Sequence, residues 1–543
     1  MLEGARVQTS VMQKTKPTID GPTASTTKRP HQPDVTEKPA PQEFSSESKR
    51  PITASMLYSL VSCPHRVTLD VYADPAQRDP VNPFVELLWE RGSSLERERM
   101  ASVEIPFVDL HTFTTKEKAH KTREAMAAGA PLIYGGRIEA DDLLGEPDLL
   151  RKEGTGYVPG DIKSGAGEEG SDDEDGGRRL KKTYAVQLAL YVDILEHLDL
   201  SAGRRGFIWD VHGAEVTYDM SVPRGVRNTE TWWDFYAAQL ATVRNIMART
   251  HDTLPAYASG TCKLCHWHSS CFQAVKAADD LTLIPELGRA KRDAMCRDIQ
   301  TVTELATINP KAYTKGNKTV FAGIGPDTLA KFHERAKLLS SQNPRPYLKA
   351  PITLPTHELE VFFDIEVDPM RDVCYLHGFI ERRGRDNSTE KFIGYFTSDT
   401  TPEAEEAAFA QAMDYMHRAQ PCAIFYYSKY ERTIYRKLQA KYPTVCSADD
   451  IEALFEPTNT IDLYSDVVRP YTEWPTHDFS IKTLAKYLGF HWRDTHPSGA
   501  ASIQWFDEWV KTGSLEIRQR ILAYNEDDCR ATRVLLDGIR NLP

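Results

Sequence analysis

The stretch Cys262-Lys263-Leu264-Cys265-His266-Trp267-His268-Ser269-Ser270-Cys271 places three of the nine cysteines within ten residues, near the middle of the chain. A fourth cysteine, Cys63, lies far upstream in Ser62-Cys63-Pro64-His65-Arg66. Four thiolates can hold an iron–sulfur cluster or a structural zinc. Compact zinc modules place their second ligand pair about 12–20 residues after the first, whereas here the fourth cysteine is most of a domain away. We therefore expect a metal or cluster that ties the start of a domain to its end.

Length and composition limit the class of protein. The 543 residues exceed one ordinary core and predict about three to four domains. No apolar run reaches the roughly 18 residues of a membrane span, and the first residues lack a secretory signal pattern. The few, unevenly spaced cysteines argue against a disulfide framework and favour a reducing compartment, the cytoplasm. The net charge of -12 does not favour nucleic acid as a partner, although this sum hides a basic middle segment.

The N-terminal 50 residues are rich in Pro, Thr, Ser and Lys and show no apolar periodicity, which predicts a disordered tail over residues 1–50. Order is expected from Ile52, where Thr53 can cap a helix with apolar residues at helical spacing. A second helix is expected over residues 83–99, carrying Gly92 and Glu96.

Two adjacent strands are expected at residues 145–150 and 157–163. Asp161 and Lys163 are two residues apart on the second strand, so their side chains leave the same face. Asp148 can lie beside them on the neighbouring strand. Two carboxylates can hold a divalent metal, and a lysine beside them can position a water or stabilise developing charge on a phosphate.

A helix expected over residues 184–195 carries Gln187 and Tyr191, which are four residues apart and share a face. Between the strands and this helix, residues 168–175 contain six acidic side chains with flanking glycines. We interpret this run as a solvated surface loop without a catalytic role.

This set of residues resembles the PD-(D/E)XK nucleases of the RecB type, and most closely their iron–sulfur branch, which includes the nuclease that accompanies CRISPR systems and the AddB nuclease. In that branch one cysteine precedes the nuclease core and three follow it, and Cys63 with 262–271 has that order. The resemblance covers about residues 52–272. It implies the following roles: metal ligands Asp148 and Asp161, catalytic Lys163, a helical motif of Gln187 and Tyr191, and 4Fe-4S ligands Cys63, Cys262, Cys265 and Cys271.

One position departs from that pattern. Many members carry a histidine in the early helix after the glycine, and this chain has Leu95 there, followed by Glu96. Either Glu96 takes over the ligand role, or this site holds its metal weakly.

The charge balance reverses after Cys271. Residues 281–345 contain eleven Lys or Arg against six Asp or Glu. Two segments, 283–292 and 321–331, each place an apolar residue and glycine in a tight turn before a helix, and they resemble helix–hairpin–helix repeats. Such turns direct backbone N–H groups at a phosphate without reading sequence. The candidate nucleic-acid contacts are Gly288, Lys291, Gly323, Gly325 and Lys331; the alternative is a helical linker with glycine caps.

The last domain is expected from residue 346, after a proline-rich linker, to residue 543. It opens with Glu360-Val361-Phe362-Phe363-Asp364-Ile365-Glu366, a buried strand from which Asp364 and Glu366 project to one face. Further strands are expected at 375–381, 391–396 and 423–427, and helices at 401–418, 430–442, 481–487 and 515–539. This is an α/β alternation.

Near the end of the chain, Tyr524 and Asp528 are four residues apart on the expected last helix. An Asp-x-Glu strand followed by a late Tyr-x3-Asp helix resembles the DEDD exonucleases of the ribonuclease H-like fold. The resemblance implies that Asp364, Glu366 and Asp528 bind metal and that Tyr524 orients the attacking water. Asp527 is a competitor of Asp528, but the spacing to the tyrosine favours Asp528.

The remaining carboxylate of that family lies in an Asn-x-x-x-(Phe/Tyr)-Asp context. The matching segment here is Tyr426-Tyr427-Ser428-Lys429-Tyr430-Glu431, with Glu in place of Asp and without the Asn. Glu431 is therefore the candidate ligand, and Asp462 is the reserve.

The order of the parts resembles a family of RecB-like nucleases that join an iron–sulfur nuclease module (51–275), a helix–hairpin–helix middle (276–345) and a ribonuclease H-like exonuclease module. The resemblance implies a multidomain α/β enzyme that uses Mg²⁺ or Mn²⁺ to process DNA, rather than RNA, at ends or in single strands. Some relatives add a helicase; this chain ends too soon for one, so a helicase would be a separate partner. Two alternatives stay open: a nucleic-acid-binding scaffold with one or both sites inactive, and zinc in place of the iron–sulfur cluster.

Overall fold

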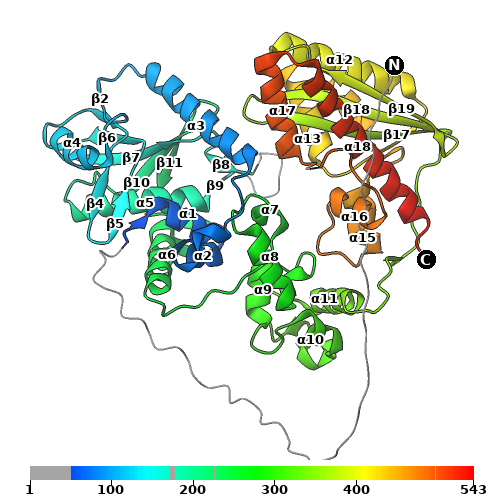
Figure 1. Cartoon of the computed structure of the whole chain (residues 1–543), viewed down its shortest axis with the longest axis horizontal. Helices are drawn as coiled ribbons and strands as arrows, with labels where there is room; N and C mark the ends of the chain where they lie inside the picture. Colours follow the sequence, from blue (N-terminus) through cyan, green and yellow to red (C-terminus); the bar gives the residue numbers. More distant parts are fainter. Residues whose placement is uncertain (1–49, 171–177, 226–227, 496) are drawn as a thin grey trace, which may run out of the picture. The chain divides into compact units, whose positions relative to one another are not determined.

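The computed structural model describes residues 50–170, 178–225, 228–495 and 497–543 (Figure 1). The tail expected over residues 1–50 lies outside this range except for its last residue, and most of the acidic loop also lies outside it. Residues Arg50–Pro543 hold together as one unit. Among the described residues, every helix is too short or too polar to cross a lipid bilayer.

A six-stranded sheet in the order β11–β10–β7–β6–β3–β2 forms the centre of the N-terminal region. Its strands are β2 (Phe107–Asp109), β3 (Leu132–Tyr134), β6 (Leu149–Glu153), β7 (Gly156–Ile162), β10 (Arg205–Trp209) and β11 (Glu215–Asp219). Strand β7 pairs antiparallel with β6 and parallel with β10. All seven of its residues are buried, which explains its apolar and glycine-rich composition.

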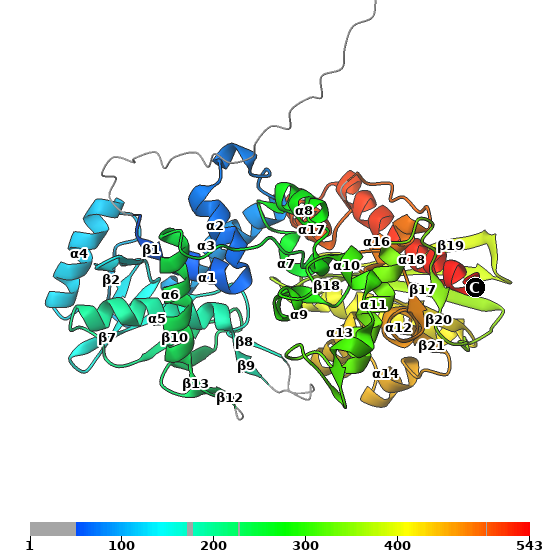
Figure 2. The same ribbon diagram turned by 90° about the horizontal axis from the view of Figure 1, so that it is seen from below.

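The same N-terminal region contains helices. They are α1 (Ala54–Ser62), α2 (Pro64–Tyr72), α3 (Pro83–Ala101), α4 (Thr115–Ala127), α5 (Lys182–His197) and α6 (Trp232–Met247). Helix α5 lies against β7 and β10 and also contacts α1 (Figure 2). As the sequence predicts, the Thr53 side chain caps α1 by accepting a hydrogen bond from the Met56 N–H at 3.3 Å.

Short strands complete this region: β1 (Ile52–Thr53), β4 (Ile138–Ala140), β5 (Leu143–Gly145), β8 (Glu168–Glu169), β9 (Arg179–Leu180), β12 (Pro223–Gly225) and β13 (Asn228–Thr231). Strand β5 pairs with β1 and β4 in a separate small sheet. The expected strand at 145–150 is therefore two strands, β5 and β6, and Asp148 lies in the connection between them.

The middle of the chain is mainly helical. Its elements are α7 (Ser259–Cys262), α8 (His268–Ala277), α9 (Gly288–Met295), α10 (Val302–Thr307) and α11 (Pro326–Leu339), the 3-10 turns η2 (Leu281–Leu283) and η3 (Pro310–Tyr313), and the hairpin β14 (Thr314–Lys315) and β15 (Lys318–Thr319). They share one apolar core that includes Leu283, Leu305 and Phe332.

The C-terminal region is built on a five-stranded sheet in the order β19–β18–β17–β20–β21. Its strands are β17 (Leu359–Asp368), β18 (Val373–Arg383), β19 (Asp386–Phe396), β20 (Ala423–Tyr426) and β21 (Thr460–Asp462). Strands β17 to β19 are antiparallel neighbours, whereas β20 and β21 continue parallel to β17. Adjacent Phe362 and Phe363 belong to apolar clusters on opposite faces, because both faces of β17 are covered.

The helices of this region are α12 (Pro402–Ala419), α13 (Tyr430–Lys441), α14 (Ala448–Leu454), α15 (Arg469–Tyr471), α16 (Ile481–Tyr487), α17 (Gly499–Thr512) and α18 (Leu515–Arg540), with a π-helical turn η4 (Leu463–Val468) and the short strands β16 (Tyr347–Leu348) and β22 (Thr472–Glu473). The expected helices at 401–418, 430–442, 481–487 and 515–539 correspond to α12, α13, α16 and α18. Helix α17 was not expected, although Ser498 caps its first turn.

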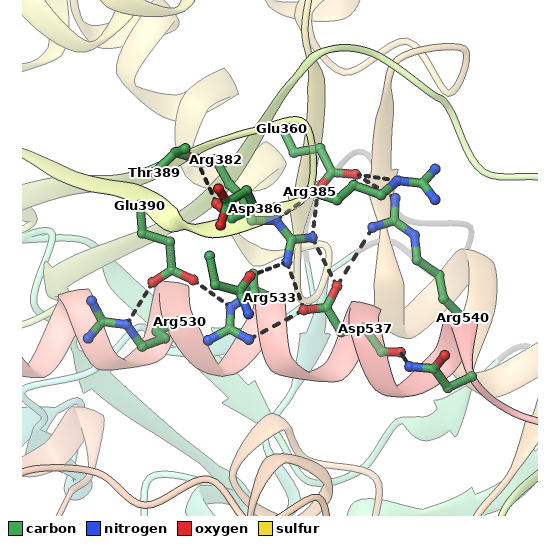
Figure 3. A network of polar contacts seen from close by, with 12 residues as sticks. Glu360, Arg382, Arg385, Asp386, Thr389, Glu390, Arg530, Arg533, Asp537 and Arg540 are labelled. Carbon is green, nitrogen blue, oxygen red and sulfur yellow. Dashed lines mark hydrogen bonds and ion pairs between the residues drawn. The ribbon is translucent and has the colours of Figure 1, made fainter.

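An ion-pair network fixes the last helix to the sheet (Figure 3). The Arg382 guanidinium, 1% exposed, bonds Glu360 on β17 at 2.6 Å and Asp537 on α18 at 2.7 Å. Because the removal of one member would leave its partner buried and unpaired, this network should be costly to break. It holds α18, and therefore Tyr524 and Asp528, in one register against β17.

Candidate active sites

Three carboxylates meet where β17 and α18 cross. One ligand oxygen each of Asp364, Glu366 and Asp528 lies within 4.8 Å of the others, and within the described residues this is the single such group of three. Asp364 and Glu366 alternate onto one face of β17, as their spacing predicts. Carboxylate oxygens at this separation suit a hard divalent cation, so the group can bind a metal.

A glycine allows α18 to approach the sheet at this point. Gly378 on β18 pairs with Asp364 in register, and a Cβ atom built there would lie 1.6 Å from the Asn525 side-chain oxygen. The Asn525 amide nitrogen in turn donates to Asp364 Oδ2 at 2.7 Å. Asn525, which sequence reasoning did not single out, therefore orients the first carboxylate.

Two further side chains hold the third carboxylate. The Trp492 indole N–H donates to Asp528 Oδ1 at 2.6 Å. The Lys482 ammonium lies 3.3 Å from Asp528 Oδ2 and donates to the Tyr524 hydroxyl at 2.7 Å. Sequence reasoning missed both residues. One indication of Lys482 was present in the sequence, because this residue lies in the first turn of the helix expected at 481–487.

Burial and mutual repulsion perturb the protonation of this cluster. Burial, followed by the charges of Asp528, Glu366 and Glu431, raises the pKa of Asp364 well above its ordinary value. Burial and then Asp528 raise the pKa of Glu366 to about 8. Burial and then the charge of Asp528 also raise the pKa of Tyr524. Carboxyl groups arranged in this way are ready to exchange their protons for a bound cation.

Two nearby acids differ in their surroundings. Glu431, 3% exposed, accepts a hydrogen bond from the Ser428 hydroxyl at 3.3 Å, and its charge acts on Asp364. Asp462 Oδ1 accepts the N–H groups of Ser428, Tyr464 and Ser465, so this carboxylate caps a helical turn. The effect of Glu431 on Asp364 keeps Glu431 as the candidate fourth ligand, and the second Asp462 oxygen, which is buried without a hydrogen-bond partner, keeps Asp462 as the reserve.

Asp527 points elsewhere. Both of its carboxylate oxygens accept hydrogen bonds from Arg493, from the backbone N–H at 2.8 Å and from Nε at 2.9 Å. The spacing argument that prefers Asp528 to Asp527 therefore agrees with the geometry.

The N-terminal site has two carboxylates and one lysine. Asp161, 1% exposed, forms an ion pair with Lys163 at 2.7 Å, so the two side chains share a face as expected. Asp148 Oδ2 accepts the Ile162 N–H at 2.8 Å, and the Asp148 N–H donates to Asp161 Oδ1 at 3.4 Å. Burial and then Asp161 raise the pKa of Asp148 to about 8.

Side chains from two helices border this pair. Burial, then the charges of Asp161 and Asp148, raise the pKa of Tyr191 on α5. Gln187, one turn earlier, has a buried side-chain oxygen without a hydrogen-bond partner. Glu96 on α3 is close enough to contribute to the raised pKa of Asp148. The carboxylate that follows Leu95 therefore reaches the neighbourhood of the site.

The four predicted cysteines line one pocket between the α1–α2 junction and the α7–α8 segment. All four thiols are free and partly buried. Burial, then Cys63, Cys262 and Cys265, raise the pKa of Cys271 to about 11. Thiols that lie close enough to raise one another's pKa repel each other when they are ionised. A bound metal cation removes this repulsion, because its ligands are thiolates.

The thiol spacing bears on the type of metal group. Tetrahedral zinc with Zn–S bonds of about 2.3 Å holds its sulfur ligands about 3.8 Å apart. In the described part of the chain, no three of these sulfur atoms lie within 4.8 Å of one another. A four-iron cluster binds each thiolate at a different iron and therefore needs the wider spacing. The four thiols that line this pocket are therefore candidate ligands of a metal group.

The two glycine turns of the middle region adopt the conformations that favour glycine. Gly288 has φ +65° at the start of α9, and Gly323 has φ +72° shortly before Gly325 caps α11. The two lysines, however, bond to Glu286: Lys291 donates to its carbonyl oxygen and Lys331 to its carboxylate, each at 2.9 Å. Both ammonium groups thus already have a protein partner, which the spacing did not indicate.

Comparison with models of protein families gives two matches. Residues 53–272 match the PD-(D/E)XK nuclease superfamily, and residues 361–539 match the RNase_H superfamily. No curated protein matches the chain. Both superfamilies are nuclease folds, so the chain has two nuclease-type domains, a nucleic-acid substrate is implied, and hydrolysis of phosphodiester bonds is the activity that they support.

Proposed function

We propose that this chain is a metal-dependent nuclease that removes nucleotides from DNA ends or single strands at its C-terminal site. The convergence of Asp364, Glu366 and Asp528 on one point carries this proposal. Three buried carboxylates repel one another unless a cation binds among them. The match to a nuclease superfamily over the same residues supports the same conclusion.

The residues of the C-terminal site would have three different roles in the proposed reaction. Asp364, Glu366 and Asp528, with Glu431 as fourth ligand, would hold Mg²⁺ or Mn²⁺, which stabilises the attacking and leaving oxygens of a phosphodiester. Tyr524 lies one helical turn before Asp528, so its hydroxyl faces the same carboxylates and can hold the attacking water. Asn525 and Trp492 keep two of the ligands oriented.

The N-terminal domain would carry a second nuclease site and a 4Fe-4S cluster. Asp148 and Asp161 would be its metal ligands and Lys163 its catalytic lysine, with Gln187 and Tyr191 in support. Cys63, Cys262, Cys265 and Cys271 would hold the cluster, which has a structural role because it joins the α1–α2 junction to the α7–α8 segment. Zinc is the alternative occupant.

The substrate and setting are part of the same proposal. We favour DNA over RNA, binding without sequence specificity by the helix–hairpin–helix middle (276–345), a separate helicase as partner, and the reducing cytoplasm as location. The basic balance of residues 281–345 supports the middle as the nucleic-acid contact.

A second candidate is a chain in which the N-terminal site is an inactive scaffold. Within the described residues, no third carboxylate joins Asp148 and Asp161 within 4.8 Å, and Lys163 already neutralises Asp161. This observation favours the C-terminal site as the active one.

The test is a cleavage assay on protein purified without oxygen. With Mg²⁺ or Mn²⁺, we expect stepwise shortening of end-labelled single-stranded DNA, slower attack on duplex DNA and RNA, and no reaction after chelation of the divalent ion. The protein should be brown, with on the order of four irons per chain. Brown, folded protein that cuts none of these three substrates with either metal would make the chain a scaffold.

A further inference from the structure

Lys482 lies among the carboxylates of the C-terminal site without pairing tightly with any of them. Its ammonium is 3.3 and 3.4 Å from the two Asp528 oxygens but only 2.7 Å from the Tyr524 hydroxyl oxygen. The side chain is 26% exposed and also passes 4.9 Å from the Tyr524 ring centre. Its shortest contact is therefore with the tyrosine.

An ammonium group donates hydrogen bonds and cannot accept them. Because Lys482 donates to the phenol oxygen, the tyrosine must direct its own O–H proton elsewhere. The acceptor beside it is the Asp528 carboxylate, which forms a hydrogen bond with the Tyr524 hydroxyl. The lysine thus fixes the direction in which the tyrosine donates.

We propose that Lys482 is a positioning residue that holds the Tyr524 hydroxyl as a donor toward the attacking water. This inference rests on the proposed nuclease function and deepens it. The ammonium also supplies one positive charge to a cluster of at least three carboxylates before a divalent ion arrives. With a divalent ion on Asp528, Lys482 would keep its shorter contact, which is the one with Tyr524.

The helix that carries Lys482 begins at a well-defined point. Ser480 caps α16 by accepting the Thr483 N–H, and Asp478 accepts hydrogen bonds from both the N–H and the hydroxyl of Ser480. Lys482 is in the first turn after this cap, so the backbone places its side chain reproducibly. Lys486, one turn later on the same helix, is exposed and serves as a matched control.

The experiment compares four variants of the full chain, each checked by thermal unfolding. Lys482→Met removes charge and donor, Lys482→Arg keeps both, Tyr524→Phe removes the hydroxyl, and Lys486→Met is the control. We expect Lys482→Met to lower kcat on single-stranded DNA by roughly ten- to a hundredfold, as for other residues that orient a ligand or reactant, with KM unchanged. Lys482→Arg should recover most of the loss, and Lys486→Met should behave as wild type.

Two readouts distinguish this role from a merely structural one. The double variant Lys482→Met with Tyr524→Phe should be no slower than the slower single variant, because both act through the same hydroxyl. Mn²⁺ binding without DNA, measured by calorimetry, should be as tight or tighter in Lys482→Met, since a competing positive charge has gone.

Multiplicative losses in the double variant, or weaker Mn²⁺ binding in Lys482→Met, would overturn the inference. So would a wild-type kcat for Lys482→Met. In each of these cases Asp364→Ala, made in parallel, must still abolish the reaction. If Asp364→Ala is active, the proposed function itself has failed, and the two failures are thereby told apart. Should Lys482→Met not fold, Lys482→Gln replaces it in the same scheme.

Discussion

The two acidic sites of this chain place their positive charge differently. At the N-terminal site Lys163 forms a direct ion pair with Asp161 at 2.7 Å, so a metal ion would have to compete with this ammonium for the carboxylate. At the C-terminal site the Lys482 ammonium forms a longer ion pair with Asp528, at 3.3 Å, and also donates to the Tyr524 hydroxyl at 2.7 Å. There a third carboxylate joins the other two, and their repulsion favours cation binding. The comparison teaches that two sites with similar acids differ in how many carboxylates stay without a close ammonium, and we expect the C-terminal site to bind a divalent ion more tightly.

The largest expected effect on the reaction rate at the C-terminal site comes from a change of the candidate fourth carboxylate, Glu431. Glu431→Gln should slow end-degradation by at least about a hundredfold, because it removes a ligand charge that acts on Asp364. Asp462→Asn should instead cost about 1 kcal/mol of folding stability, through a weakened helical cap, and leave most activity. Rates on end-labelled DNA together with unfolding midpoints give both numbers. If Asp462→Asn is the inactive variant, the reserve residue is the ligand.

A second prediction separates the sites through the cysteine pocket. Cys271→Ser should lose iron and brown colour and lower the unfolding midpoint of the N-terminal region by at least about 5 °C, because binding energy of the metal group is folding energy. End-degradation at the C-terminal site should persist. Cys296→Ser is the control, since Cys296 lies outside the pocket and donates to the Asp293 carbonyl oxygen. Colourless wild-type protein that carries one zinc would contradict the iron–sulfur assignment.

The sequence could predict the C-terminal carboxylates because their pattern is local. Asp364 and Glu366 alternate on a strand, and Tyr524 and Asp528 are one helical turn apart, so each pair shares a face whatever the rest of the fold does. Lys482 comes from a separate helix, and its contact with Tyr524 depends on how α16 packs on α18. No spacing rule connects residues 42 positions apart.

Other features could be predicted from the sequence only in part. The glycines at 288 and 323 predict turns, and the structure has turns there. The partners of Lys291 and Lys331 could not be predicted, because Lys331 reaches Glu286 through a tertiary contact and Lys291 bonds the carbonyl of this residue, whose φ is +65°. No sequence pattern marks Gly378 either, although the close approach of Asn525 requires a glycine at this position.

A third prediction uses pH. The folded-state pKa of Glu366, and that of Asp148, is raised to about 8. Each group therefore contributes stability that is fully present below its unfolded pKa of about 4 and is lost as pH rises through about 8. Without divalent ions, Glu366→Gln should match wild type near pH 4 and be more stable, by up to a few kcal/mol, near pH 9.

Asp148→Asn should show the same pH trend, which makes the two sites comparable in one experiment. Added Mg²⁺ should reverse the order of stability for Glu366→Gln and wild type, because only wild type keeps the full ligand set. The reversal should be smaller for Asp148→Asn, where Lys163 competes with the metal. Equal reversals at both sites would remove the proposed difference between them.

The smallest expected effect concerns the middle region. Lys331→Gln should leave DNA affinity unchanged and cost under about 1 kcal/mol of stability, because its partly exposed ammonium pairs with Glu286. Lys315 and Lys318, exposed on the β14–β15 hairpin, should instead matter for DNA. Their double change to Gln should lower the salt slope of binding by up to about two. A loss of affinity confined to Lys331→Gln would restore that lysine as a phosphate contact.

The most direct test is a reciprocal pair of variants assayed for stepwise degradation of an end-labelled single strand with Mg²⁺ or Mn²⁺. Asp364→Ala should abolish the reaction while DNA binding stays nearly intact, because it removes a metal ligand and no surface cation. Lys163→Ala should leave the reaction in place and remove only such cleavage as the N-terminal site performs. Degradation that survives Asp364→Ala and vanishes with Lys163→Ala would reverse the assignment and make the C-terminal domain the scaffold.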